Sequence, residues 1–300
     1  MNSFFGVLAS PNCRYFNLDI ANAITNFGQE IIKLTAKEIE KLGYDVIYSD
    51  TDSVFVHTKL EKEKAEKLGK EISEKIDSFY KKYVKDNYNR VSYLDLEFDK
   101  LFLYLLMPIL RVHETKKEKE DKDKELKGAK KRYAGLIEEK EDGKIKEKLE
   151  ITGLEAIRGD WTEAAGEFQR ELLMKVFHNE NPIQFIKSFI KSLKDGKLDK
   201  QLIYRKSIRK DLKDYTKTTP PHVKAARKLD HLDSNIIEYL ITTDGPEPIQ
   251  KLKHKIDYEH YIEKQIQPIA KTILETLGID FQEALDGSKQ KTLFWALVKS

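Results

Sequence analysis

An acidic segment between two apolar stretches constrains the fold of this chain more than any other sequence feature. Residues 44–48 and 54–57 are strand-like, and residues 49–53 between them contain Asp50 and Asp52. Two short apolar runs around a polar segment predict a β-hairpin, which places the two aspartates at its tip. Side chains two residues apart lie on the same side of an extended chain, so we expect the two carboxylates to be neighbours.

Two carboxylates at such a tip predict a site for divalent cations. Neighbouring negative charges repel each other unless a cation lies between them, and Mg²⁺ takes oxygen ligands from one or two carboxylates together with substrate phosphates. A pair of Mg²⁺ ions about 3.5–4 Å apart can activate a hydroxyl and stabilise a leaving oxygen. The alternative is a solvated turn, because Asp and Ser are common turn residues. The apolar stretches on both sides favour the metal site, because they anchor the tip.

Hydrophobic periodicity predicts helices, strands and a second hairpin in the first 160 residues. The expected elements are helices over residues 17–42 and 61–83, strands over 91–98 and 101–110, and a hairpin of residues 133–137 with 145–151. Asn17 or Asp19 can cap the first helix, and Gly43 ends it. Residues 115–131 contain eight Lys and five acidic residues, and we expect them to form a poorly ordered solvated loop or strand extension.

The pattern becomes helical after residue 153. Asp160 and Glu163 have the spacing of a capping box ahead of an apolar helix, and Asn181-Pro182 starts the next helix. The last strong helix covers residues 262–277. The sequence therefore predicts an α+β fold with a boundary near residue 160. Residues 1–160 form a mixed unit with an antiparallel sheet and helices, and residues 161–300 form a mostly helical one.

Composition places this chain among globular proteins. Of its 300 residues, 40% are apolar, which is sufficient for a sizeable core, and the net charge is only +3. The single cysteine, Cys13, fits a reducing compartment. The longest apolar run, residues 101–110, is too short to span a bilayer, and the first five residues include no basic residue of a signal peptide. These features predict a cytoplasmic protein of about two domains with no membrane partner.

Positive charge is concentrated in residues 204–228, which we call the basic strip. The strip contains nine Lys and Arg and two Asp, a net charge of +7, whereas the other 275 residues have a net charge of −4. Such a strip favours contact with the phosphate backbone of nucleic acid. The alternative is a solvated helix face of mixed charge, which the small number of acidic residues disfavours. The expected DNA contacts in it are Tyr204, Arg205, Lys206, Arg209 and Lys210.

Several motifs resemble those of family B DNA polymerases, in the order in which that family has them. Residues 48–53, Tyr-Ser-Asp-Thr-Asp-Ser, resemble the Y-x-D-T-D-S palm motif, and residues 2–6 resemble the end of the K-x3-N-S-x-Y-G fingers motif. Residues 130–133, Lys-Lys-Arg-Tyr, resemble the K-K-x-Y motif that contacts primer–template DNA. The matches continue in residues 153–161, 204–206, 220–223 and 257–261, which resemble the element leading into the thumb and thumb segments, especially of the polymerase II-like branch.

The resemblance implies the palm and thumb of a polymerase that adds nucleotides to a primer on a DNA template. Asp50 and Asp52 are then catalytic residues and ligands of two Mg²⁺ ions, and Glu97 is a further metal ligand, the alternative being a plain polar-face residue. Asn2, Phe5 and Thr51 lie at positions expected to contact the dNTP. The resemblance also implies DNA contacts by Lys130, Lys131, Arg132, Tyr133 and Arg158, and by His222 within the basic strip. Trp161 is expected in the core.

The departures from the family pattern are also informative. The family's triphosphate-binding Lys would precede Met1, no D-x2-S-L-Y-P-S segment supplies the other palm Asp, and no exonuclease region is present. Phe5 replaces the usual Tyr. These departures predict that activity needs a second chain, or a missing N-terminal half, carrying exonuclease, fingers and the other palm Asp. The partners are then primer–template DNA and dNTP, with association to the nucleoid.

Three alternatives remain at this point. A non-catalytic DNA-binding or scaffolding remnant of a polymerase is the main one, although both aspartates of the motif are intact. A reverse transcriptase also has an acidic hairpin, but the thumb motifs oppose it. An unrelated Mg²⁺ phosphohydrolase leaves the matches at residues 130–133 and 220–223 unexplained.

Overall fold

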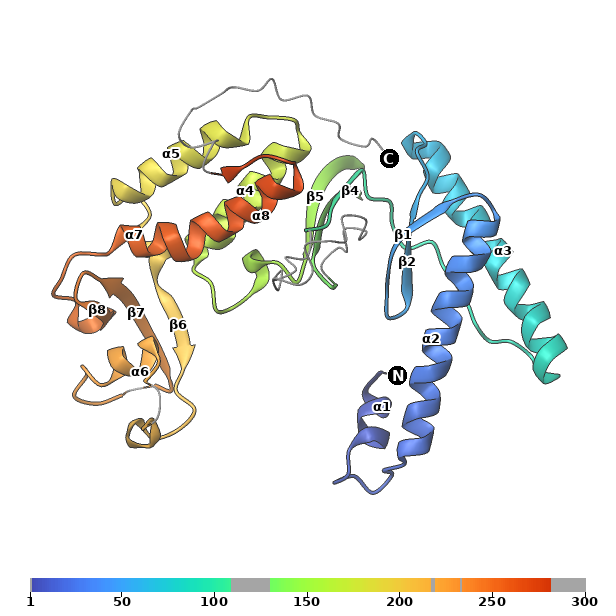
Figure 1. Ribbon diagram of the computed structural model, residues 1–300, viewed down its shortest axis with the longest axis horizontal. Helices are drawn as coiled ribbons and strands as arrows, with labels where there is room; N and C mark the ends of the chain where they lie inside the picture. Colours follow the sequence, from blue (N-terminus) through green and yellow to red (C-terminus); the bar gives the residue numbers. More distant parts are fainter. Residues whose placement is uncertain (1, 109–129, 217–218, 233, 282–300) are drawn as a thin grey trace, which may run out of the picture. The chain divides into compact units, whose positions relative to one another are not determined.

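The protein is an α+β chain with three small antiparallel sheets, as the sequence predicts. A computed structural model describes residues 2–108, 130–216, 219–232 and 234–281, with side chains from residue 5 onward (Figure 1). Most of the predicted charged loop at residues 115–131 is therefore outside the described residues. The chain forms two compact units, one of residues up to Leu103 and one that begins at Tyr104. No described helix has the length and apolar content needed to cross a membrane.

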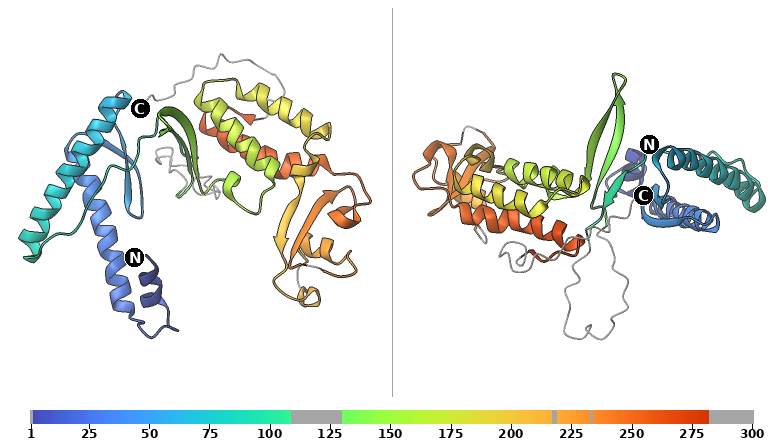
Figure 2. Two further views of the ribbon diagram at one scale, coloured as in Figure 1. Left: turned by 180° about the vertical axis from the view of Figure 1, so that it is seen from behind. Right: turned by 90° about the horizontal axis from the view of Figure 1, so that it is seen from above.

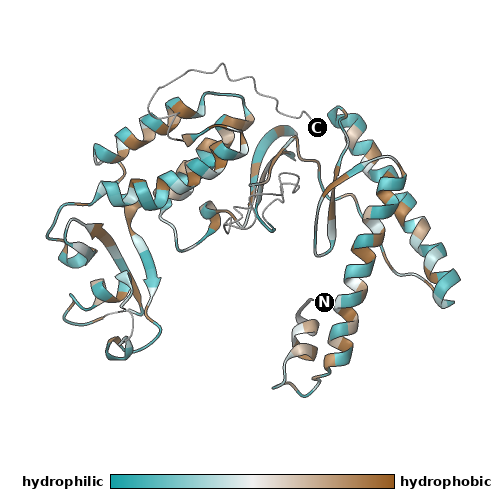
Figure 3. Ribbon diagram, in the orientation of Figure 1, coloured by the Kyte–Doolittle hydropathy of each residue, from teal (hydrophilic) through white to brown (hydrophobic). Residues whose placement is uncertain are grey.

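The first unit contains three helices and one hairpin. Its elements are α1 (Asn2–Ala9), α2 (Leu18–Lys41), β1 (Asp45–Asp50), β2 (Ser53–His57) and α3 (Lys62–Tyr88). The predicted cap of α2 is confirmed, because the Asn17 side chain accepts a hydrogen bond from the Ile20 N–H at 3.0 Å. Gly43, with φ of +89°, follows the helix as expected. Both long helices are amphipathic, so apolar and polar residues alternate along them in Figure 3.

A small core holds the first unit together. Buried residues of α2 and α3, among them Ile39, Ile72 and Ile76, form one cluster. Val46, Val54 and Val56 of the hairpin pack against that cluster, so the two helices cover the hairpin.

The prediction of a strand at residues 91–98 is wrong, because this segment makes no ladder with the described strands.

The second unit contains two three-stranded sheets and a helical layer. Its elements are β3 (Tyr104–Leu106), β4 (Tyr133–Glu141), β5 (Lys144–Thr152), α4 (Glu163–Phe177), α5 (Pro182–Lys194), β6 (Tyr204–Ser207), α6 (Pro221–Ala226), β7 (Ile236–Thr242), β8 (Gly245–Pro248), α7 (Tyr258–Tyr261) and α8 (Gln267–Thr276). Single turns of 3-10 helix cover Glu155–Ile157, Asp199–Leu202, Leu212–Asp214 and Ile249–Lys251, and a π-helical segment, Ile262–Ile266, joins α7 to α8. One large cluster unites these elements, and Figure 1 shows α4 beside α5 and α8.

The second predicted hairpin is confirmed and is longer than predicted. β4 and β5 pair over nine residues each, and the turn residues Asp142 and Gly143 both have positive φ. This is the backbone that Asp-Gly favours in a two-residue hairpin. The hairpin extends beyond the helices of its unit, as the right view of Figure 2 shows.

Three predictions for the second unit need correction. The cap of α4 is Thr162, whose Oγ1 accepts from the Ala165 N–H at 3.3 Å, and not Asp160, which pairs with Arg158 instead. The strand predicted at residues 101–110 is only three residues long among the described residues. Periodicity also missed the sheet β6-β7-β8, which lies within a region predicted to be mostly helical.

Candidate functional site

The acidic motif forms a tight turn at the tip of the β1–β2 hairpin. Asp50 is the last residue of β1 and pairs with Ser53, so Thr51 and Asp52 alone make the turn. The Asp52 N–H and the Ser53 hydroxyl both donate to the Asp50 carbonyl, at 2.6 and 3.2 Å. Thr51 has φ of +54°, a conformation that β-branched residues rarely adopt. Asp52 therefore follows a reversal of the chain and does not continue the extended strand that the sequence argument assumed.

Both carboxylates lie at this tip in an environment that fits a hard cation. Asp50 is half-buried, and its Oδ1 accepts a hydrogen bond from the Thr51 hydroxyl at 3.0 Å, which restrains the carboxylate. Asp52 is exposed. Two carboxylates on one short turn supply only oxygen donors, and Mg²⁺ prefers such donors. The donor set therefore fits the predicted ion.

Aromatic contacts anchor the hairpin behind its tip. Tyr48 and Phe55 are cross-strand partners, and their ring centroids are 5.3 Å apart in an edge arrangement. Phe55 also stacks on Phe102 at 5.9 Å. Such pairs add to the stability of a two-stranded sheet. They support the expectation that the tip is held by the strands on both sides of it.

Glu97, the third predicted metal ligand, is exposed on an extended segment beside α3. The segment is fixed on both sides of Glu97. The Leu96 N–H donates to the Asp77 carboxylate at 2.8 Å, and the Phe98 ring packs so closely on Gly69 that a Cβ there would lie 2.3 Å from it. Within the described residues, the carboxylates of Asp50, Asp52 and Glu97 do not gather within 4.8 Å of one another. The role of Glu97 as a metal ligand therefore stays a prediction.

The predicted nucleotide contacts are in the same unit as the turn. Thr51 lies in the turn, and Asn2 and Phe5 lie in α1, which packs along α2. Phe5 is 37% exposed, whereas the Asn2 side chain is outside the described part of the chain.

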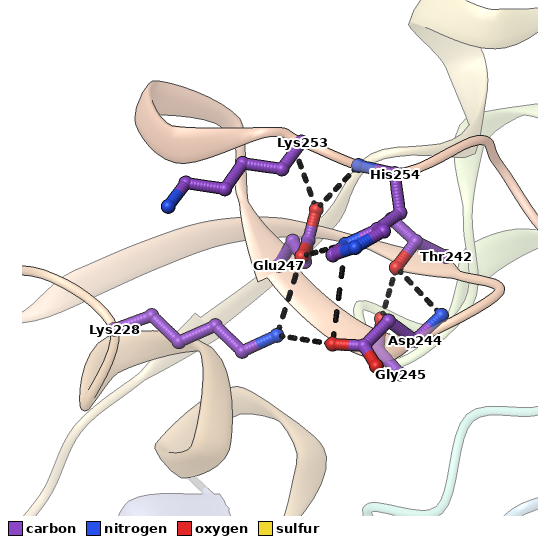
Figure 4. Close-up of polar contacts among 7 residues, drawn as sticks. All are labelled: Lys228, Thr242, Asp244, Gly245, Glu247, Lys253 and His254. Atoms are coloured by element: carbon purple, nitrogen blue, oxygen red, sulfur yellow. Dashed lines mark hydrogen bonds and ion pairs between the residues drawn. The ribbon is translucent and has the colours of Figure 1, made fainter.

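A second carboxylate cluster, which sequence reasoning missed, lies in the other unit. Ligand atoms of Asp244, Glu247 and His254 lie within 4.8 Å of one another (Figure 4). The Lys228 ammonium already lies between the two carboxylates, 3.6 Å from Asp244 and 3.3 Å from Glu247. A lysine thus takes the place that a cation would occupy, and the cluster is a structural ion network. Asp244-Gly245, a turn signal after an apolar run, could have located it.

Glu247 is the buried centre of that network. Its side chain is only 2% exposed and accepts from the backbone N–H groups of Lys253 and His254, at 2.8 and 3.1 Å, and from His254 Nδ1 at 2.7 Å. Burial alone raises the pKa of Glu247, but these hydrogen bonds and that from Lys228 outweigh it, and the pKa falls to about 2. The network joins the end of α6 to β8 and to the loop after it.

The motifs at residues 130–133 and 153–161 come together in the structure. Gly153, with φ of +62°, lies against the Lys131 carbonyl so closely that a Cβ would be 2.0 Å from its oxygen. The Arg132 guanidinium forms an ion pair with Glu155, a residue only 9% exposed. Arg132 is thus half-buried and paired with Glu155, whereas Lys130 and Lys131 are exposed. Tyr133, half-buried, is the first residue of β4.

Buried polar contacts continue from this junction into α4. Gln169 donates to the Glu155 carboxylate at 2.8 Å and accepts from the Ala156 N–H at 2.6 Å. Arg158 makes two hydrogen bonds to Asp160, of 3.0 and 2.7 Å, and this pairing lowers the pKa of Asp160. Trp161 packs against the core, as predicted.

The basic strip divides into core and surface residues. Tyr204 is 9% exposed and stacks on Tyr239 and Tyr261, at 5.3 and 5.6 Å, so it has a packing role; burial raises its pKa. Arg205 is exposed and pairs with Glu238 of β7 at 2.6 Å. Burial lowers the pKa of His222, and the nearby positive charge of Lys206 lowers it further.

The loop between β6 and α6 presents two exposed cations of the strip that have no ion pair within the described residues. They are Arg209 and Lys210. The Arg227 guanidinium fixes this loop, because it donates to the carbonyls of Leu212 and Tyr215 at 2.8 and 3.1 Å. Unpaired cations on a fixed loop are available to phosphates.

Comparison with known proteins defines the class to which this fold and these motifs belong. The family model for DNA polymerase family B matches residues 1–128 and 123–277. The chain belongs to DNA polymerase family B.

Curated relatives of the chain come from bacteria, archaea and animals. It is 37% identical to DNA polymerase II of Escherichia coli strain K12, over 96% of this chain and 36% of that protein. It is 29% identical to DNA polymerase 2 of Aeropyrum pernix, over 97% of this chain and 33% of that protein. It is 28% identical to the DNA polymerase alpha catalytic subunit of Xenopus laevis, over 93% of this chain and 19% of that protein. The chain therefore spans about a third of the length of the first two relatives.

Proposed function

We propose that this chain is the C-terminal part of a DNA-directed DNA polymerase, contributing the acidic hairpin of the palm and the thumb that grips DNA. The observation that carries the proposal is the turn bearing Asp50 and Asp52, in a chain that belongs to family B. In the proposed reaction the primer 3′-hydroxyl attacks the α-phosphate of a dNTP, and pyrophosphate leaves. Residues 1–160 are the proposed palm part, with the end of the fingers motif, and residues 161–300 the thumb.

In this proposal Asp50 and Asp52 hold Mg²⁺, with Glu97 as the candidate third ligand. When bound, two such ions activate the attacking hydroxyl and stabilise the leaving oxygen. The chain's own contribution is to hold both carboxylates on one short turn and to restrain Asp50 through the Thr51 hydroxyl. Asn2, Phe5 and Thr51 are the proposed contacts to the nucleotide.

The proposed DNA surface lies within the second unit. Its contacts are the exposed residues Lys130, Lys131, Arg158, Arg205, Arg209 and Lys210, with the half-buried Lys206, His222 and Tyr133. Arg132 and Tyr204 act through packing, because one is paired with Glu155 and the other is stacked in the core. Phosphate contacts of this kind bind duplex of any sequence and weaken as salt rises.

A further polymerase portion, either a second chain or a preceding segment, is the proposed partner. It supplies exonuclease, fingers and the other palm Asp, and works with this chain on nucleoid DNA in the cell. Two facts support the proposal: the chain spans about a third of its relatives' length, and the sheet that carries the acidic turn has only two described strands. Two-stranded sheets are marginal alone, and an open strand edge is a natural pairing surface.

Primer extension tests the proposal. This chain is combined with the polymerase portion from the same genome, and extension with Mg²⁺ is compared for the wild type, Asp52→Asn and a matched control, Asp45→Asn. Asp45 is an exposed residue at the other end of the same hairpin. We expect Asp52→Asn to reduce the rate by at least about 100-fold and the control to leave it unchanged, with duplex binding retained in both.

The same assay separates catalysis from the main alternative. Equal extension by Asp52→Asn and the wild type contradicts the catalytic assignment. Duplex binding without any extension, even by the wild-type complex, identifies a non-catalytic DNA-binding remnant.

A further inference from the structure

Apolar surface is distributed unevenly between the two units. Within the described residues, thirteen of the seventeen exposed large hydrophobic side chains belong to the unit that ends at Leu103. That unit contains only eight of the thirty-eight buried hydrophobic residues. Scattered exposed apolar residues are normal, but a concentration of them marks an interaction surface.

Three of these side chains form a stripe on the N-terminal half of α2. Ile20, Ile24 and Phe27 are between 46% and 53% exposed. They follow the spacing i, i+4, i+7, which places them on one face of the helix. We call this surface the α2 face. An apolar stripe of this kind is normally covered by another element.

A cavity of about 400 Å³ adjoins the α2 face at Phe27. Its other walls include Tyr83 and Tyr88 near the end of α3 and Leu94 of the segment after it. Tyr83 packs against Phe79 and Tyr88, with centroids 5.7 and 6.2 Å away, so the aromatic wall is braced.

The hydroxyls of Tyr80 and Tyr83 in this cavity are already paired with the protein, and Arg90 is the one cation among its described lining residues. The Tyr83 hydroxyl donates to Glu30 at 3.1 Å, and the Tyr80 hydroxyl bonds with the Ile31 carbonyl at 2.8 Å and with Thr35 at 2.7 Å. Apart from Arg90 and the paired Glu30, the walls therefore offer mainly ring faces and aliphatic groups. A bulky apolar side chain suits the cavity better than a polar ligand does.

We infer that the α2 face and this cavity are the docking surface for the polymerase portion that the relatives possess outside the matched region, and that this portion inserts an apolar side chain between Phe27, Tyr83 and Leu94. The inference rests on the proposed function. This portion is the expected occupant because the same unit also has a sheet of only two described strands. A second copy of the chain, or its own C-terminal segment, would not supply the remaining two-thirds of the relatives' length. One partner thus covers the apolar stripe and completes the sheet.

Binding of the full chain to that polymerase portion, expressed from the same genome, tests the inference. Phe27→Glu and Leu94→Glu each place a charge at the cavity, and Ile145→Glu is a matched control at an exposed β5 position in the other unit. We expect each cavity variant to raise the Kd at least tenfold and the control to leave it unchanged. All three residues are at least 38% exposed, so the variants should fold, which circular dichroism checks.

The outcomes separate this inference from the proposed function. Three outcomes would contradict the docking surface. They are wild-type affinity in both cavity variants, absence of a complex, and self-association of the chain through this face. A complex that needs Phe27 yet never extends a primer supports the docking surface and contradicts the catalytic proposal. If the complex with Phe27→Glu extends a primer as well as the wild type does, the docking surface is contradicted and the catalytic proposal is not.

Discussion

The two units of this protein differ in how completely each is built. The unit with the acidic turn has one two-stranded sheet, a core of a few residues from two helices, and most of the exposed apolar side chains among the described residues. The unit with the basic strip has two three-stranded sheets and a large core in which most polar groups are paired.

This difference suggests a division of labour. Duplex DNA needs a fixed array of cations, which one folded unit can present by itself. Two-metal chemistry needs several ligands at one point, and the described part of the first unit offers only two carboxylates on its turn. Under the proposed function, the basic surface is therefore expected to bind DNA within this chain alone, whereas the acidic turn is expected to need a partner for catalysis.

The comparison predicts that equivalent truncations in the two units have very different effects. Phe168 is completely buried against Phe185 and Phe189, whereas Phe27 is 53% exposed. We expect Phe168→Ala to lower the free energy of unfolding by about 3–5 kcal/mol. We expect Phe27→Ala to change it by less than about 0.5 kcal/mol. Denaturant unfolding of each variant measures both, and a large loss in Phe27→Ala would show that the α2 face is already covered.

The Glu247 network predicts how the stability of the second unit depends on pH. The folded-state pKa of Glu247, about 2, is below its ordinary value of 4.5. Its ionised form therefore stabilises the fold above about pH 4.5, and this contribution is lost as the pH falls toward 2. Glu247→Gln should lower the free energy of unfolding by about 1–3 kcal/mol at neutral pH and flatten the dependence between these limits. Trp161 fluorescence during denaturant unfolding at each pH measures this free energy. If Glu247→Gln leaves the pH dependence unchanged, Glu247 is not the group that causes it.

The smallest expected effect concerns the salt dependence of DNA binding. Changing Lys206, Arg209 and Lys210 to Gln should reduce the slope of log K against log salt by about 0.9 for each lost phosphate contact, so by up to about 2.7. The matched control changes Lys70, Lys75 and Lys81, three exposed lysines of α3, to Gln. Fluorescence anisotropy of a labelled duplex provides the slopes. If both triple variants have the same slope, binding follows overall charge and the strip is not the contact.

Local signals in the sequence predicted much of the fold. The Asn17 cap, the Asn181-Pro182 helix start and the Asp142-Gly143 turn each depend on a few neighbouring residues, and all three are confirmed. The predictions were wrong where contacts with other residues determine the local structure. Asp160 has the spacing of a cap, but Arg158 holds it and Thr162 caps α4.

The candidate site was predictable at its turn and less so elsewhere. Sequence alone located Asp50 and Asp52, because the turn is local. It could not tell that Tyr204 is stacked in the core or that Arg132 pairs with Glu155, because those contacts join segments far apart in sequence. Charge counting treats every cation alike, whereas burial and pairing decide which of them remain for phosphates.

Binding of Mn²⁺, a spin probe for the Mg²⁺ site, is the most direct test of whether the acidic turn holds metal. Paramagnetic broadening of backbone amide signals in the full chain locates even a weakly bound ion. We expect broadening centred on Thr51 and Ser53 that disappears when Asp50→Asn and Asp52→Asn are combined. Broadening centred on Asp244 and His254, or broadening at the turn that survives both substitutions, would contradict it.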